Sequence, residues 1–278
     1  MIPKVIHYCW FGGNPLPESA VQCIKSWEKY APDYKILEWN ESNFDFHKCS
    51  YIEEAYRVKK WAFVSDYARF YILYHEGGVY FDTDVELIAP IENILSRGPF
   101  MGCEQDARKN LSIRIAPGLG LASVSGMNFY KEILNFYDKQ HFIRPDGSLN
   151  EHTVVDYTTD LLFKFGLKNK SGIQQIEDIT IYPAEYFCPL DYQTGKLTIT
   201  PNTRSIHHYT ATWHSPLEAQ CAKLERFFCK KYGLQKGEKY YHVVSFPYRI
   251  ANRMQQSGLK KTILYAFKKL KHKELKII

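Results

Sequence analysis

Two acidic residues stand at positions 82 and 84, directly after the short apolar segment Val79-Tyr80-Phe81. If that segment is a β-strand, an extended backbone places the carboxylates of Asp82 and Asp84 on one face, roughly 7 Å apart. Hard carboxylate oxygens suit Mg or Mn, and such an ion keeps positions open for the oxygens of a diphosphate. An isolated D-x-D pair is usually two solvated acids, but ligands gather at strand ends in α/β folds. The sequence therefore predicts a metal and diphosphate site here.

Asp66 and Arg69 lie three residues apart on a segment expected to be helical. Spacing alone favours an intrahelical ion pair. Their neighbours, however, are apolar, and a charged pair on a buried helix costs several kcal/mol unless a polar pocket receives it. A sugar-binding pocket would meet that need.

The segment from Ser205 to Trp213 is polar and aromatic, and it contains the adjacent pair His207 and His208. A neutral imidazole there could ligate a metal ion. Two neighbouring histidines are more often structural or solvated, so the spacing leaves both interpretations open.

The remaining pattern predicts an α/β fold, because strands and helices alternate along the chain at the spacing of crossover units. A break near 59–60 divides one helical stretch, and its second half, 61–75, is apolar enough to be buried. The expected strands are 3–11, 35–39, 79–81 and 99–103, and the expected helices are 17–30, 51–76, 127–137, 153–165 and most of the last forty residues.

The charge distribution separates the body of the chain from its end. The formal charge is +6, and residues 259–278 hold seven lysines against one glutamate, so the rest of the chain is balanced. A nucleic-acid enzyme would carry a basic stripe through its body, and we therefore exclude nucleic acid as a partner. Apolar residues recur at helical spacing in the tail, which is typical of a helix lying on an anionic membrane, although a solvated helix packed on the domain fits equally well.

No secretory signal or membrane-spanning run is evident, and the seven cysteines form no C-x-x-C pair. We expect a cytoplasmic protein, at the inner face of the plasma membrane if the tail binds lipid. Within 278 residues we expect one catalytic domain over 1–240 and a helical basic extension over 241–278.

Three motifs, read in order, resemble a known family: IHYCWFGG at 6–13, SDYAR at 65–69 and GGVYFDTD at 77–84. They are similar to those of the family 32 glycosyltransferases, DXD sugar transferases that include bacterial capsular-polysaccharide enzymes. A more distant likeness is to the catalytic domain of the glucosylating toxins. The resemblance covers 3–90 and recurs near 205–215. It implies a GT-A-like sheet flanked by helices, a nucleotide-sugar donor, Mn or Mg, and transfer with retention of configuration.

The resemblance also implies roles for residues that bind the donor. Trp10 would stack on the base, and Tyr80 would contact the nucleoside. Asp66 and Arg69 would hold the donor sugar, while Asp82 would contact the ribose and the metal shell.

The same resemblance implies that Asp84 binds the metal directly and that His208 occupies a metal or metal-water position. Trp213 would lie near the diphosphate. Relatives often have Gly-Ser before this tryptophan, where this chain has Ala211-Thr212. That departure alters the expected third metal contact.

The implied mechanism is a front-face substitution, in which the departing phosphate takes the proton of the acceptor hydroxyl and no protein nucleophile is needed. A double displacement would instead require a carboxylate, for which Glu104, Asp106 and Glu151 are the candidates. The predicted function is transfer of a hexose, with galactose as the first guess, from a UDP-sugar to a glycan or lipid-linked acceptor in surface-polysaccharide assembly. Glucose, N-acetylglucosamine and a GDP-mannose donor remain open.

Two other classes compete with this prediction. A non-catalytic nucleotide-sugar or glycan-binding protein could use the same scaffold, although a binder need not keep Asp82, Asp84 and Arg69. A metal-dependent phosphodiesterase or nuclease also uses acidic pairs, but it normally clusters more His and Asp ligands around two metals.

Overall fold

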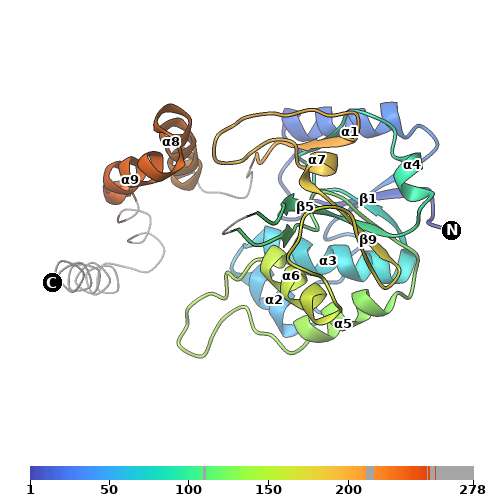
Figure 1. Cartoon of the computed structure of the whole chain (residues 1–278). Coiled ribbons are helices and arrows are strands. Elements are labelled where there is room, and N and C mark those ends of the chain that lie inside the picture. Colours follow the sequence, from blue (N-terminus) through green and yellow to red (C-terminus); the bar gives the residue numbers. More distant parts are fainter. Residues whose placement is uncertain (109–110, 211–215, 249, 251–253, 255–278) are drawn as a thin grey trace. The chain divides into compact units, whose positions relative to one another are not determined.

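The computed structural model describes residues 1–108, 111–210, 216–248, 250 and 254 (Figure 1). The chain divides into two compact units, the first made of 1–190 and 197–210 and the second of 191–196 and 211–278. The expected catalytic domain over 1–240 and basic extension over 241–278 are defined by function, and they stay predictions.

The first unit is built on one large mixed sheet, with β6 (Arg114–Ile115) paired to β5 outside the main path. In spatial order its other strands are β2 (Lys35–Trp39), β1 (Val5–Cys9), β3 (Gly78–Tyr80), β7 (Leu121–Ser123), β5 (Phe100–Gln105), β9 (Ile179–Tyr182) and β8 (Gln174–Ile176). The expected α/β class is confirmed. β1 is parallel to both β2 and β3, as the spacing predicts, but β7 runs antiparallel to both β3 and β5.

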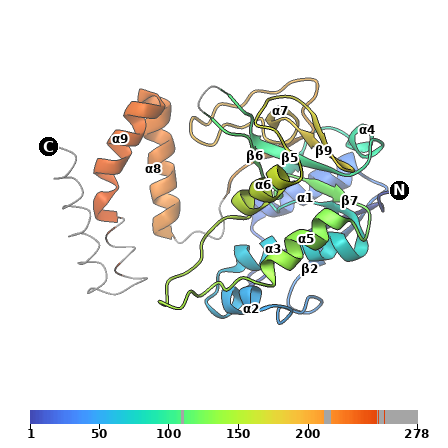
Figure 2. The same cartoon turned by 60° about the horizontal axis from the view of Figure 1, so that its bottom comes forward.

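Helices cover both faces of this sheet (Figures 1 and 2). One face carries α2 (Ser50–Arg57), α3 (Trp61–Glu76), α5 (Asn128–Tyr137) and α6 (Val154–Lys164), and the other carries α1 (Glu18–Tyr30) with the short helices α4 (Glu92–Leu95) and α7 (Ala184–Phe187). Side chains alternate across the sheet because successive residues of a strand point to opposite faces. Tyr80 joins the core on the α3 side, whereas its neighbours Val79 and Phe81 join the core on the α1 side.

The link between α3 and β3 decides where the two acids emerge. The expected break before α3 is confirmed, since Lys59 adopts a φ of 60° between α2 and α3. α3 ends at Gly77, whose φ of 67° reverses the chain into β3. His7 on β1 fixes this turn, because its Nε2 lies 3.0 Å from the Gly77 carbonyl oxygen.

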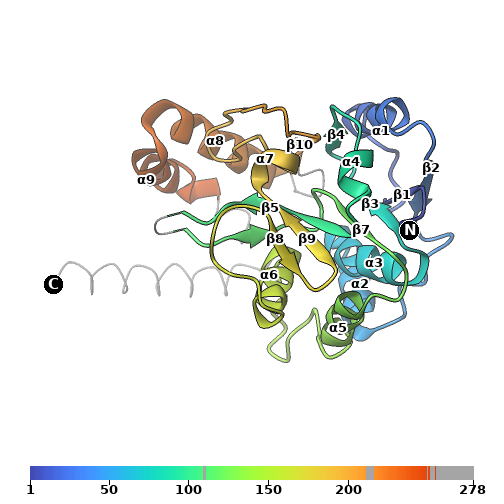
Figure 3. The same cartoon turned by 45° about the vertical axis from the view of Figure 1, so that its right-hand side comes forward.

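A small second sheet completes the first unit. β4 (Val85–Leu87) pairs antiparallel with β10 (Ser205–His207) (Figure 3). In this register His207 lies opposite Val85. The indole of the fully buried Trp27 on α1 donates a hydrogen bond to the Val85 carbonyl oxygen at 2.7 Å. This sheet brings a segment near residue 205 against residues near 85.

The second unit contains a helical hairpin of α8 (Pro216–Tyr232) and α9 (Leu234–Val244), joined at Gly233 with φ of 76°. The helices approach closely at Gly237, where a Cβ atom would overlap the backbone of Cys229. The predicted basic tail, 259–278, lies outside the described residues. Within the described part of the chain, no helix combines the length and apolar character that crossing a bilayer requires.

Candidate functional site

Asp82 lies just beyond β3, within reach of a buried guanidinium from α3. Arg69 Nη2 is 3.3 Å from Asp82 Oδ1 and 2.9 Å from Asp66 Oδ1, so one cation pairs with two carboxylates. Only 4% of Arg69 and 8% of Asp66 is exposed. The pair is thus more than the intrahelical contact that spacing alone suggests, because it extends to the strand end.

Burial, opposed by the charge of Arg69 and assisted by that of Asp82, raises the pKa of Asp66 to about 7. Burial would lower the pKa of Arg69, but the charge of Asp82 and the neighbouring acids hold that pKa above its ordinary value. The guanidinium therefore stays charged, and it is the cation that pairs with both Asp66 and Asp82.

Tyr80 supports the same carboxylate from β3. Its hydroxyl donates a hydrogen bond to Asp82 Oδ1 at 3.0 Å, and the guanidinium carbon of Arg69 lies 5.0 Å from the centre of its ring. Tyr80 is buried, which raises the pKa of its hydroxyl well above the ordinary value, so the hydroxyl remains a donor. Arg69 and Tyr80 together fix Asp82 on one side, and Asp66 pairs with Arg69.

Gly118 closes the other side of Asp82, and sequence reasoning missed it. The backbone N–H of Asp82 donates to the Gly118 carbonyl oxygen at 3.0 Å. A Cβ atom at Gly118 would overlap Asp82 Oδ2 and come within 3.2 Å of Arg69 Nη1. Only a glycine leaves room for the carboxylate here. The two glycines of the run Ala116-Pro-Gly-Leu-Gly120 were the available signal.

Asp84 is held differently, by residues from the distant β10. His207 Nε2 lies 3.1 Å from Asp84 Oδ1, and Thr210 donates to Oδ2 from its backbone N–H at 2.9 Å and its hydroxyl at 3.3 Å. Tyr209, between these two residues, has a φ of 51°, which lets side chain 207 and backbone 210 reach one carboxylate. Both oxygens of Asp84 therefore have protein partners.

The His207–Asp84 contact is an ion pair. Burial would lower the pKa of His207, but the Asp84 charge outweighs it and raises the pKa to about 10. Burial would raise the pKa of Asp84, but the His207 charge and the Thr210 hydrogen bonds lower it to about 2. The sequence analysis identified this histidine pair, but the family resemblance assigned the metal position to His208 and not to His207.

The other predicted site residues lie apart from this pair or outside the description. His208 Nε2 contacts Glu86 Oε2 at 2.8 Å, and only its backbone N–H reaches Asp84, through the carbonyl oxygen at 2.9 Å. Trp10 is half-buried just beyond β1 and donates from Nε1 to the Asn14 carbonyl oxygen at 2.6 Å. Trp213 lies outside the described residues. The roles predicted for these three stay predictions.

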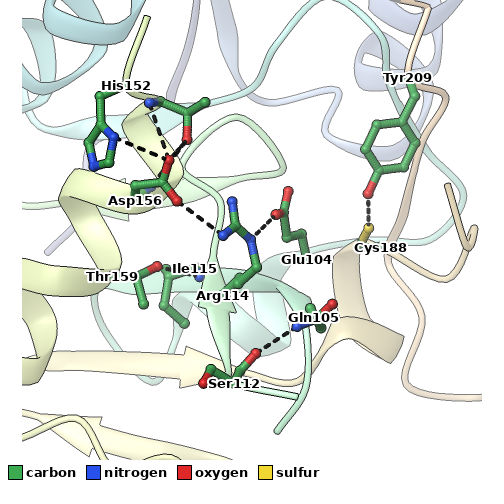
Figure 4. Close-up of polar contacts among 11 residues, drawn as sticks. Glu104, Gln105, Ser112, Arg114, Ile115, His152, Asp156, Thr159, Cys188 and Tyr209 are labelled. Atoms are coloured by element: carbon green, nitrogen blue, oxygen red, sulfur yellow. Dashed lines mark hydrogen bonds and ion pairs between the residues drawn. The ribbon is translucent and has the colours of Figure 1, made fainter. Parts of the chain in front are cut away.

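The carboxylates considered as nucleophiles all have structural partners. Glu104 accepts from Arg114 Nε at 2.8 Å, and the same guanidinium reaches Asp156 of α6 at 3.0 Å (Figure 4). The Asp106 carboxylate accepts from the Ala184 backbone at 3.0 Å. The third, Glu151, pairs with a lysine at 2.8 Å. Two of these contacts connect β5 with α6 and with α7. The acids therefore have a structural role that needs no part in the reaction.

Asp82 and Asp84 could bind a divalent ion only together with further ligands that other molecules supply. Carboxylate oxygens are the donors that Mg and Mn prefer. Among the described residues, no three His, Cys, Asp or Glu side chains come together as a metal-binding group. An ion between Asp82 and Asp84 would therefore complete its shell with phosphate oxygens and water, as Mg²⁺ commonly does.

Comparison with known proteins gives this site a family context. Residues 17–101 match the family model "Glycosyltransferase sugar-binding region containing DXD motif". This match covers 85 of the 278 residues. That region contains five of the predicted site residues, namely Asp66, Arg69, Tyr80, Asp82 and Asp84, and it begins after Trp10.

Two curated relatives come from Schizosaccharomyces pombe. Inositol phosphoceramide mannosyltransferase 1 is 31% identical over 36% of this chain and 33% of its own length, and inositol phosphoceramide mannosyltransferase 3 is 32% identical over 30% and 24%. The chain thus spans a third or less of these relatives. A solved structure described as PaToxG glycosyltransferase is 20% identical and covers 59% of this chain and 69% of its own, with a TM-score of 0.42.

Proposed function

We propose that this chain is a retaining, metal-dependent glycosyltransferase that moves a hexose from a nucleotide-sugar to a glycan or lipid-linked acceptor in surface-polysaccharide assembly. The observation that carries the proposal is the position of Asp82 and Asp84. Both acids follow β3 at the carboxyl end of parallel strands, inside the matched DXD region. Arg69, buried between two carboxylates, adds a fixed cation to the same place.

The side chains have distinct tasks in this proposal. Asp82 and Asp84 hold the donor diphosphate through Mn or Mg, which supplies charge neutralisation to the leaving nucleotide when bound. Arg69 and Asp66 bind hydroxyls of the donor sugar, and Tyr80 keeps Asp82 in position. Catalysis would then rest on orientation and electrostatic stabilisation, without a protein nucleophile.

The proposed donor is a UDP-hexose, with galactose as the first candidate. Mannose is the second candidate, because two relatives are named mannosyltransferases. The proposed cellular setting is the cytoplasmic side of the plasma membrane, with residues 259–278 as a basic contact to lipid. The competing possibility, a nucleotide-sugar or glycan-binding protein, shares the donor site but lacks the reaction.

The test is release of nucleoside diphosphate from a panel of UDP- and GDP-sugars with Mn, comparing wild type with Asp84→Asn. Asp33→Asn is a matched control, since Asp33 lies at the amino end of β2, whereas the two acids follow the carboxyl end of the parallel strand β3, and Asp33 pairs with the exposed Lys4. Metal-dependent release that is lost in Asp84→Asn and kept in the control supports the transferase. Tight donor binding by calorimetry without release from any donor would replace it with the binding protein.

A further inference from the structure

The helical hairpin of the second unit presents an apolar face to solvent. On α9, the neighbouring residues Val243 and Val244 are 73% and 43% exposed. Phe246 and Tyr248, which follow the helix, are 46% and 44% exposed. These four residues form the outer face of the hairpin. Large apolar side chains exposed together mark a surface that meets a partner.

α8 packs against another part of α9. Gly237 approaches the backbone of Cys229 on α8, and the ring centre of Tyr240 lies 4.8 Å from that of Tyr232 and 6.1 Å from that of Phe228. The side of α9 that carries Gly237 and Tyr240 is therefore covered by α8. The outer face is left for a partner outside the described hairpin.

The charge around the outer face indicates what kind of partner it fits. Residues 216–248, which include the hairpin and the outer face, contain six Lys and Arg against three Asp and Glu, whereas residues 1–215 contain twenty-one against twenty-six. Within the hairpin, Lys230, Lys231, Lys236 and Lys239 are exposed. A basic hairpin with exposed aromatic and aliphatic side chains thus belongs to a chain whose residues 1–215 are weakly acidic.

We infer that the outer face docks the hairpin on an anionic lipid bilayer. Aromatic and aliphatic side chains would enter the interface between headgroups and acyl chains, and the lysines would meet the negative surface potential. The acidic body would be repelled by the same surface, so only the second unit is attracted. This inference is independent of the proposed reaction and concerns a surface distinct from residues 259–278.

Two other partners fit the observations less well. A second copy of the hairpin would bring together two surfaces that each carry a surplus of three positive charges, and the repulsion opposes association. A nucleic acid would pair with the lysines but would leave Val243, Val244 and Phe246 in water. A bilayer with anionic headgroups satisfies both the charge and the apolar surface.

The test is flotation of the full-length chain with vesicles of phosphatidylcholine, with and without phosphatidylglycerol. The variant Val243→Ser/Val244→Ser/Phe246→Ser should lower the partition coefficient on the anionic vesicles about tenfold, because three apolar side chains are lost from the interface. A matched control, Ile173→Ser/Leu197→Ser/Ile199→Ser, removes three equally exposed apolar residues from the first unit and should partition like wild type. Residues 259–278 are the same in every protein.

A gain-of-signal measurement removes the ambiguity of a misfolded variant. Val243→Trp should show stronger quenching by brominated lipids than wild type on anionic vesicles, and weak quenching on phosphatidylcholine alone. Equal partitioning of the triple variant and wild type would overturn the inference, as would unchanged quenching of Val243→Trp. Self-association of wild type in lipid-free ultracentrifugation that is lost in the triple variant would assign the outer face to a second copy instead.

Discussion

The two acids of one short motif are supported by different parts of the molecule. Asp82 is held by α3 and β3, which precede it directly, whereas Asp84 is held by β10, more than 120 residues later. The Asp82 side is a buried cluster around one guanidinium, and the Asp84 side is an ion pair with one imidazole. The comparison shows that residues nearby in the sequence can position one acid of such a site, while a long-range strand pairing positions the other.

Removing the guanidinium should have the largest effect. Arg69→Met leaves Asp66 and Asp82 without their cation in a buried setting, and the free energy of unfolding should fall by about 3 to 5 kcal/mol. Urea denaturation measures this, and Arg204→Met, at a guanidinium that contacts Asn93 and backbone carbonyls, is the control. An Arg69 variant as stable as the control would mean that the Asp82 side is not an electrostatic cluster.

Acidification should lower the stability of the folded chain through His7, which fixes the turn at Gly77 before β3 and Asp82. The Trp39 indole donates to His7 Nδ1 at 3.0 Å, so the neutral ring carries its proton on Nε2 and donates to Gly77. Burial lowers the pKa of His7 to about 4, against the opposing hydrogen bond. The unfolded chain takes up a proton near pH 6.5 and the folded chain does not, so stability falls as the pH drops from about 6.5 to about 4.

The size of this loss is at most about 3 kcal/mol. Thermal or urea unfolding between pH 7 and pH 5 should show a shallower pH dependence in His7→Gln than in wild type. Parallel pH profiles for the two proteins would mean that His7 takes up its proton at the same pH in the folded and the unfolded chain.

The Asp84 side should distinguish two adjacent histidines. His207→Gln removes a charged partner of Asp84, and the free energy of unfolding should fall by about 2 kcal/mol, the range for hydrogen bonds to charged groups. His208→Gln loses only a contact with the half-exposed Glu86 and should cost less than about 1 kcal/mol. Calorimetric unfolding of both variants decides this, and a reversed order would show that His208 is the structural partner.

Substitution of Gly118 should have the smallest effect on stability, but it should lower donor turnover. A methyl group in Gly118→Ala displaces the Asp82 carboxylate, and we expect about a tenfold loss in donor turnover, equivalent to about 1.4 kcal/mol. Gly102→Ala is a steric control away from the acids, since its Cβ would press against Phe187. Equal turnover in both variants would remove Gly118 from the support of Asp82.

Several elements could be predicted because their signals are local. The break before α3, the glycine turn into β3 and the buried pair Asp66 and Arg69 all follow from neighbouring residues. Gly118 could not be predicted in this way, because its role comes from a loop that crosses the end of β3 from elsewhere in the chain.

The sequence by itself determined that two acids follow a buried strand and that an acidic and a basic residue share the preceding helix, because helical and extended periodicities act over a few residues. Only the tertiary structure decided which histidine meets Asp84. His207 ends β10 and His208 follows it in the chain, and successive side chains of an extended segment point to opposite faces. The antiparallel register with β4 turns His207 toward Asp84 and leaves His208 beside Glu86. A register is a property of two paired strands, so no pattern within one segment contains it.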